Sequence, residues 1–200
     1  MKTELEKCLA GETFNGGDKE LVAMALNAKR LLKELNNADY ADVELKKSIL
    51  QKLFGKIGEN VHIDIDFHCE YGKHIFVGNK VVINMNCTFV DNNIIEIGNN
   101  VLIASNVQLY TATHSTKVNE RMVDKEDIGT EICRTYTLPI KISDGVWIGG
   151  GAIILSGVTI GKNSVIGAGS VVTRSIPDNC VAVGNPCRVI KYIDNKNDEI

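Results

Sequence analysis

The chain has 200 residues, of which 44% are hydrophobic and 24% charged, enough for one domain with an ordinary core. Its 22 Lys and Arg against 25 Asp and Glu give a net charge of −3, which argues against nucleic-acid binding, because phosphate contacts need a basic surplus. No apolar run approaches the roughly 20 residues of a membrane span, and the start lacks the apolar region of a signal peptide. We therefore expect a cytoplasmic protein with no membrane or nucleic-acid partner.

The aliphatic residues divide the chain into two parts. Residues 1–56 hold 10 of the 14 Leu but only 3 of the 42 Ile and Val, whereas the remainder holds the other 39 and 14 of the 18 Gly. Leu favours helices, and β-branched residues favour strands. The division predicts an N-terminal helical segment over 1–56, a β body over 57–191 and a short C-terminal tail over 192–200.

Capping residues and apolar spacing predict three helices in the first segment. A short helix covers residues 3–10. Asp18 is an N-cap for a second helix, whose apolar stripe spans residues 21–35, and Asp42 caps a third helix that stops at Gly55. We expect each apolar stripe to pack against the β body.

The β body is a repeat of six residues. An aliphatic residue opens each hexad, as the positions Ile142, Ile148, Ile154, Ile160, Ile166 and Val172 show. The same frame begins earlier at Ile97, with weaker copies from Ile57 and Val77. A period of six is neither that of a helix nor that of a single strand, and it predicts a solenoid of triangular section. Three hexads, or 18 residues, would close one coil, so that Ile142 lies under Ile160 in a core too narrow for many aromatic residues.

One interruption breaks this repeat, at residues 115–139, and His114 stands at its base. A histidine there suits a general base, because imidazole titrates near neutrality, although an ordinary surface histidine is the simpler interpretation of the residues alone. Further along, the glycines at 149–151 offer backbone N–H groups that a reacting oxyanion can approach closely. Tight corners alone would explain one or two of these glycines.

Several stretches carry a more specific pattern: Cys-Glu-Tyr-Gly at 69–72, Asn-Met-Asn-Cys-Thr-Phe-Val-Asp at 84–91, Tyr-Thr-Ala-Thr-His at 110–114, Gly-Val-Trp-Ile-Gly at 145–149 and Gly-Asn-Pro-Cys-Arg-Val-Ile at 184–190. In them the chain resembles the hexapeptide-repeat acyltransferases, and most closely their maltose/galactoside O-acetyltransferase branch, over nearly its whole length. The resemblance implies a mainly β fold, a left-handed parallel β-helix with an N-terminal α-helical segment and a protruding loop. It also implies a homotrimer with active sites between subunits.

The resemblance further implies an acetyl-CoA-dependent O-acetyltransferase acting on a hydroxyl of a sugar such as maltose, glucose or a galactoside. His114 would be the general base for direct attack, with no enzyme nucleophile and no metal. The positions implied at the acceptor are Asn84, Asp91 and Tyr71. Those implied at acetyl-CoA are Gly150, Ala168, Thr173, Arg174, Arg188 and Lys191, of which the basic three can pair with phosphates.

Three departures from the family concern the acceptor side. The loop after His114 is longer, which leaves Glu131 as the candidate to orient the imidazole; Val82 replaces an aromatic residue, and Asn92 replaces an acidic one. An acetyltransferase of the same fold acting on serine or an antibiotic therefore stays open.

Two other functions are weighed against an acetyltransferase. A zinc carbonic anhydrase on the same fold would need converging ligands, but a step of six moves to the next face of the triangle, so we expect His62, His68 and His74 to diverge. A non-catalytic scaffold would leave His114, the glycine run and the basic tail without a purpose.

Overall fold

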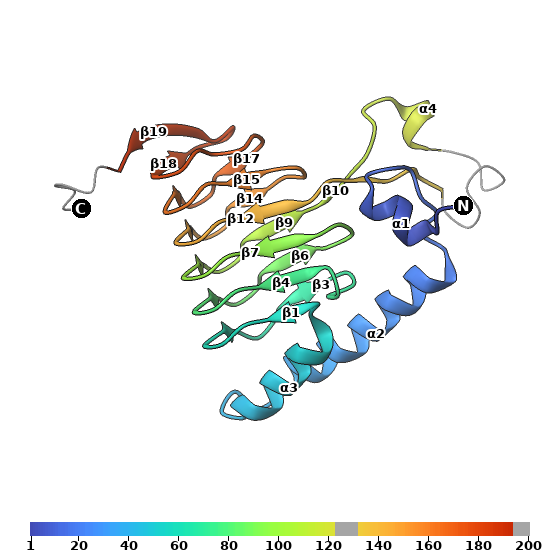
Figure 1. The fold of residues 1–200 in the computed structure, drawn as a ribbon, viewed down its shortest axis with the longest axis horizontal. Helices are drawn as coiled ribbons and strands as arrows, with labels where there is room; N and C mark the ends of the chain where they lie inside the picture. Colours follow the sequence, from blue (N-terminus) through green and yellow to red (C-terminus); the bar gives the residue numbers. More distant parts are fainter. Residues whose placement is uncertain (123–131, 194–200) are drawn as a thin grey trace.

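The computed structural model describes residues 1–122 and 132–193. Figure 1 shows a prism of stacked short strands with helices at its N-terminal end. The helices are α1 (Glu4–Leu9), α2 (Lys19–Asn36), α3 (Val43–Leu53) and the short α4 (Val118–Arg121). The predicted N-caps are confirmed, because the Asp18 side chain accepts a hydrogen bond from Glu20 N and the Asp42 side chain accepts one from Leu45 N.

All strands except β10 (Ala112–Thr113) and β11 (Tyr136–Thr137) form three sheets, the faces of the prism. Sheet A contains β1 (Lys56–Ile57), β4 (Ile75–Val77), β7 (Ile95–Ile97), β12 (Ile140–Ile142) and β15 (Thr159–Ile160). Sheet B contains β2 (His62–Ile63), β5 (Val82–Ile83), β8 (Leu102–Ile103), β13 (Trp147–Ile148), β16 (Val165–Ile166), β18 (Cys180–Val183) and β19 (Arg188–Tyr192). Sheet C contains β3 (His68–Cys69), β6 (Thr88–Val90), β9 (Gln108–Tyr110), β14 (Ile153–Ile154) and β17 (Val171–Val172).

The opening aliphatic residues of the hexads fill the prism. Parallel pairing places Ile142 beside Ile160, Ile148 beside Ile166 and Ile154 beside Val172, as predicted. All six side chains are buried. Successive coils are hydrogen-bonded along the whole stack, so each short strand is stabilised by its neighbours above and below rather than by its own length.

The coils are not uniform, which corrects the predicted 18 residues per coil. The partners Val77 and Ile97 are 20 residues apart, as are Ile57 and Val77, whereas Ile142 and Ile160 are 18 apart. The two additional residues lie where sheet C leads into sheet A, in the segments 70–74 and 91–94. We call this edge of the prism the C/A corner. The long loop leaves the prism at the same corner.

The N-terminal segment is packed onto the solenoid. The apolar side chains of α2 and α3 belong to the same buried cluster as the coils, and Asn36 of α2 exchanges hydrogen bonds with the backbone of Phe67. The α1 segment lies at the C/A corner, where the buried Asn93 amide donates to the carbonyls of Cys8 and Leu9 and to Thr137 Oγ1. Among the described residues, no helix has the length and hydropathy of a membrane span.

Candidate active site

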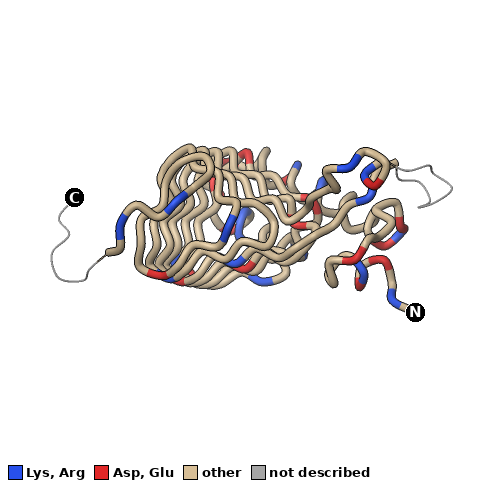
Figure 2. The backbone as a smooth tube through the Cα atoms, turned by 90° about the horizontal axis from the view of Figure 1, so that it is seen from above, with Lys and Arg blue, Asp and Glu red and all other residues tan. Residues whose placement is uncertain are grey.

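His114 follows β10 (Ala112–Thr113), which pairs with β11 (Tyr136–Thr137) in an antiparallel ribbon that projects from the C/A corner. Figure 2, which looks along the stack, shows this excursion and the N-terminal segment leaving the prism on the same side. The imidazole is exposed, and its Nδ1 lies 2.8 Å from the carbonyl oxygen of Arg134. Because a carbonyl only accepts, Nδ1 carries the proton and the lone pair is on Nε2. A general base needs this arrangement.

The backbone of Arg134 is a contact that sequence reasoning missed. Every residue has a backbone carbonyl, so residue type does not show which one contacts His114. The loop also lacks the hexad period from which the position of Arg134 could be predicted. Glu131, the acidic residue expected to orient His114, lies outside the described residues.

Asp91 and Tyr71 also lie at the C/A corner, but in the interior. Asp91 is fully buried, and its Oδ1 accepts hydrogen bonds of 2.9 Å from the amides of both Glu70 and Tyr71. Its Oδ2 is buried with no partner among the described residues. Tyr71 is 5% exposed and meets the ring of His74 edge-on. Both side chains are buried in the chain, whereas the family resemblance implied that they face the acceptor.

Burial sets the ionisation of this interior group. It raises the pKa of Asp91 to about 7, against which the amide hydrogen bonds act only in part. It also raises the pKa of Tyr71 and lowers the pKa of His74, whose Nδ1 donates to the Asp91 carbonyl. Asp91 is therefore about half protonated near pH 7, beside Tyr71 and His74, whose neutral forms burial favours.

The glycine run lies at a different edge, where sheet B leads into sheet C, which we call the B/C corner. Gly149 begins a tight turn closed by a hydrogen bond from Ala152 N to its carbonyl, and Gly151 has a φ of +69°, which is typical of position i+2 of a type II turn. A Cβ on Gly149 would lie 2.6 Å from Ala168 N, so the coil above excludes any side chain there. The fold therefore explains Gly149 and Gly151.

Gly150 is the glycine that the fold does not require. Its φ is not positive, and a Cβ would make an ordinary contact with Ser105 O at 3.4 Å. The amides of Gly149 and Gly151 are used in bonds to Ile166 O and Ser105 O, whereas the Gly150 amide has no partner among the described residues. This N–H is therefore available to an external acceptor.

Ala168 and Asn84 share the B/C corner with Gly150. Ala168 holds the same turn position one coil higher, 18 residues on, and its amide likewise has no partner in the described part of the chain. Asn84, two coils lower, is half-buried and donates its Nδ2 to Ile103 O, which leaves its Oδ1 as an acceptor. The corner thus presents a column of polar groups that no neighbouring coil uses.

The predicted phosphate-binding residues gather in the last coil. Thr173 and Arg174 are exposed directly after β17, and Arg188 and Lys191 are exposed on β19 at the edge of sheet B. Arg188 donates to the carbonyl of Cys187, so its guanidinium is already partly oriented. The chain places these residues at the end of the prism away from the helices.

A single chain does not bring the two corners together. The B/C and C/A corners bound sheet C on opposite sides, and the six residues of one hexad span up to about 20 Å. His114 belongs to the C/A corner and Gly150 to the B/C corner. An acetyl group that met both would need a second surface to close this gap.

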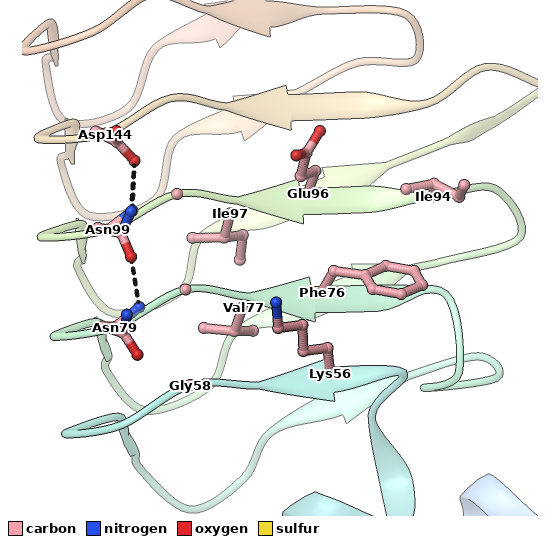
Figure 3. A pocket seen from close by; sticks show the side chains of 12 residues that line it. Lys56, Gly58, Phe76, Val77, Asn79, Ile94, Glu96, Ile97, Asn99 and Asp144 are labelled. Carbon is pink, nitrogen blue, oxygen red and sulfur yellow. Dashed lines mark hydrogen bonds between the residues drawn. The ribbon is translucent and has the colours of Figure 1, made fainter.

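An open cavity of about 640 Å³ lies elsewhere, on the outer face of sheet A. Lys56, Phe76 and Glu96 line it (Figure 3), beside a ladder in which Asn79 N donates to Asn99 Oδ1 and Asn99 N donates to Asp144 Oδ1. It contains none of the residues predicted for the acceptor or for acetyl-CoA, so it is not the predicted site.

The alternative chemistries find no support in the positions of their residues. His62 lies on sheet B, His68 on sheet C and His74 is buried before β4, so the three diverge as expected, and the described residues contain no cluster suited to a metal ion. Burial raises the pKa of the Cys8 and Cys87 thiols to about 11, which disfavours a thiolate nucleophile at these positions.

Comparison with known proteins finds acetyltransferase sequence motifs in both the N-terminal segment and the repeat. A family model for the maltose acetyltransferase hexapeptide capping motif matches residues 7–58, and a model for the bacterial transferase hexapeptide (six repeats) matches residues 139–174. The galactoside O-acetyltransferase of Escherichia coli (strain K12) is 38% identical over 192 residues, 96% of this chain and 90% of that protein.

Two solved structures extend the likeness to the fold. A maltose O-acetyltransferase from Clostridium difficile 630 is 45% identical with a TM-score of 0.87, over 97% of this chain and 99% of that one. A hexapeptide-repeat acetyltransferase from Vibrio cholerae O1 biovar eltor, complexed with acetyl-coenzyme A, is 38% identical with a TM-score of 0.85. The match covers 97% of this chain and 100% of that one. The left-handed β-helix, of about six turns, is thereby confirmed. The chain belongs to the hexapeptide-repeat acetyltransferases, in their maltose and galactoside O-acetyltransferase branch.

Proposed function

We propose that the protein transfers the acetyl group of acetyl-CoA to a hydroxyl of a sugar. The observation that carries the proposal is the state of His114: an exposed imidazole whose Nδ1 is held by Arg134 O and whose Nε2 has no partner among the described residues. The related structure solved with acetyl-coenzyme A supports the choice of donor, and the maltose and galactoside enzymes among the relatives support a sugar as acceptor.

In the proposed reaction, His114 Nε2 removes the proton of the acceptor hydroxyl. The freed oxygen forms a bond to the thioester carbon, and the Gly150 N–H donates to the oxyanion that develops on the carbonyl. When the C–S bond breaks, the imidazolium returns the proton to the CoA sulfur, so no charge remains on the enzyme. No covalent intermediate on the protein is needed.

The residues of the last coils fit an extended, negatively charged cosubstrate. The unpartnered amides of Gly150 and Ala168 suit the carbonyl groups of the acetyl and pantetheine parts, since each such amide needs an acceptor. Thr173, Arg174, Arg188 and Lys191 are the groups we assign to the phosphates.

On the acceptor side the residues divide into two kinds. Asn84, half-buried with its Oδ1 available, is the one we assign to direct contact with the sugar. Asp91 and Tyr71, which are buried in the chain, are assigned to supporting the corner beneath it.

We further propose that the active form is a homotrimer. The outward column of sheet B is apolar, with Leu102 and Trp147 41% and 47% exposed and with Val82 and Val165 in register beside them. The corresponding column of sheet A is polar except for Phe76, and its Glu96 and Lys141 form an ion pair of 3.3 Å. Apolar faces of this kind suit a ring of copies, which would bring the B/C corner of one subunit to the C/A corner of its neighbour.

A thiol-release assay with acetyl-CoA tests the function. We expect release of free CoA with maltose, glucose or a galactoside, and none without an acceptor. Serine and chloramphenicol are the comparison acceptors. Faster release with serine or chloramphenicol would contradict the sugar assignment, and no release with any of them would contradict acetyl transfer to these classes. The cytoplasmic location remains a prediction of the sequence.

A further inference from the structure

The loop after His114 folds back on itself through a closed series of hydrogen bonds. His114 Nδ1 donates to Arg134 O, and Arg134 N donates to Arg121 O, both over 2.8 Å. The Arg121 guanidinium then donates over 2.8 Å to the carbonyl of Ser115, the residue next to His114. Arg121 thus makes two contacts around the catalytic imidazole. Its carbonyl accepts from the peptide of Arg134, which holds Nδ1, and its side chain donates to Ser115, which follows His114.

Helix α4, which contains Arg121, is too short to be stable by itself. It has four residues and no side-chain N-cap, whereas isolated helices need roughly 12 or more residues to persist in water. Two side chains link it to the turn before it: the Arg121 guanidinium, and the Glu120 carboxylate, which accepts from Ser115 Oγ over 2.7 Å. On its other side a backbone bridge joins Met122 to Cys133. Without the Arg121 side chain, the Arg121 carbonyl, which accepts from Arg134 N, would no longer be held against the turn after His114.

We propose that Arg121 is the positioning residue for His114. It acts through the Arg134 peptide, which fixes both the direction of the imidazole and the nitrogen that carries its proton. A guanidinium suits this place because it is planar and always charged, and it reaches Ser115 O and Thr116 O together, over 2.8 and 3.4 Å. The proposal rests on the proposed function, in which His114 is the base.

The test compares Arg121→Ala and Arg121→Lys in the full-length protein with Arg30→Ala as a control. Arg30 is an exposed arginine on α2 that pairs with Glu34, so its loss controls for removing one guanidinium. Two readouts are independent: steady-state kinetics with acetyl-CoA and the best sugar, and the ¹⁵N chemical shifts of the His114 ring, which report its tautomer. Melting temperature shows whether each variant is folded.

We expect Arg121→Ala to lower kcat by about 10- to 100-fold, the effect of misplacing a catalytic group by about 1 Å, with the KM for acetyl-CoA nearly unchanged. The ring should change from the Nδ1–H tautomer to a mixture with Nε2–H. Arg121→Lys should fall between Arg121→Ala and the wild type, and Arg30→Ala should resemble the wild type. An unchanged tautomer, or a rise in KM equal to the loss in kcat, would overturn the proposal. A changed tautomer with full turnover would uphold the contact and overturn the role of His114 as base.

Discussion

Two corners of the prism carry the proposed chemistry, and they are built differently. At the B/C corner the hexad frame is kept, and the turns at Gly150 and Ala168 repeat with the same bonds from coil to coil. At the C/A corner two coils have two additional residues each, a third carries the loop, and α1 is attached there. The regular corner therefore offers backbone N–H groups and the amide side chain of Asn84, whereas the irregular corner offers the imidazole of His114.

This difference follows from what a repeat can supply. A regular turn presents the same amide in every coil, which suits a long cosubstrate lying along the stack but provides no acid or base. An imidazole needs its own partner, here Arg134 O, and that partner is reached only by leaving the repeat. The interruption is thus the part of the chain in which proton transfer is expected to arise.

The largest effect is expected at the irregular corner. Replacing His114 by Asn removes the base while retaining a polar side chain of similar size, and should lower kcat by about 10²- to 10⁴-fold. Binding of CoA, measured by calorimetry, should be preserved because the residues that we assign to its phosphates lie elsewhere. Turnover at the wild-type rate would remove His114 from the mechanism.

A smaller loss is expected at the regular corner. Gly150 holds position i+1 of its turn, where proline is well tolerated, so Gly150→Pro deletes the unpartnered N–H with little change of backbone. Loss of one oxyanion donor should lower kcat about 10²- to 10³-fold.

The matched control is Gly150→Ala, which keeps the N–H and places a Cβ at an ordinary contact distance from Ser105 O. It should lose at most a few-fold in kcat. Equal losses in the Ala and Pro variants would show that the site needs the absence of a side chain at Gly150 rather than its amide.

The last prediction concerns stability rather than turnover, again at the C/A corner. Burial raises the pKa of Asp91 from 3.8 to about 7, so between these values the folded chain keeps a proton that the unfolded chain has lost. The contribution of this group to the free energy of unfolding therefore falls as the pH rises from about 4 to about 7, and it stays constant above pH 7. Melting temperatures of the wild type minus those of Asp91→Asn should decrease by roughly 10 °C over this window, because a shift of about three pKa units corresponds to about 4 kcal/mol. A difference that is independent of pH would contradict the buried, protonated carboxyl.

Much of the solenoid could be predicted from the sequence because its signal is local and repeated. The inward aliphatic residues, the helix caps and the stacking of Ile142 on Ile160 are all confirmed. The 20-residue coils were not predicted, because the segments 70–74 and 91–94, which contain the additional residues, carry no hexad pattern of their own, and the hexads on either side keep their inward aliphatic positions.

The candidate site could be predicted only in part. His114 is marked by the break in the repeat and by the family resemblance, and Gly150 by its place in the glycine run. The Arg134 carbonyl that holds His114 is a backbone atom, and the burial of Asp91 depends on how a lengthened corner folds, so neither follows from residue type.

The central claim is that one site is assembled from the C/A corner of one subunit and the B/C corner of its neighbour. Co-expression of His114→Asn with Gly150→Pro, on chains carrying different tags, tests it directly. If the corners meet between subunits, every mixed trimer has both intact corners at one of its three interfaces, so mixed trimers isolated through both tags should recover about one third of the wild-type kcat per site. Activity in the mixed trimers no higher than in either variant alone would place both corners of a site in the same chain and contradict the account.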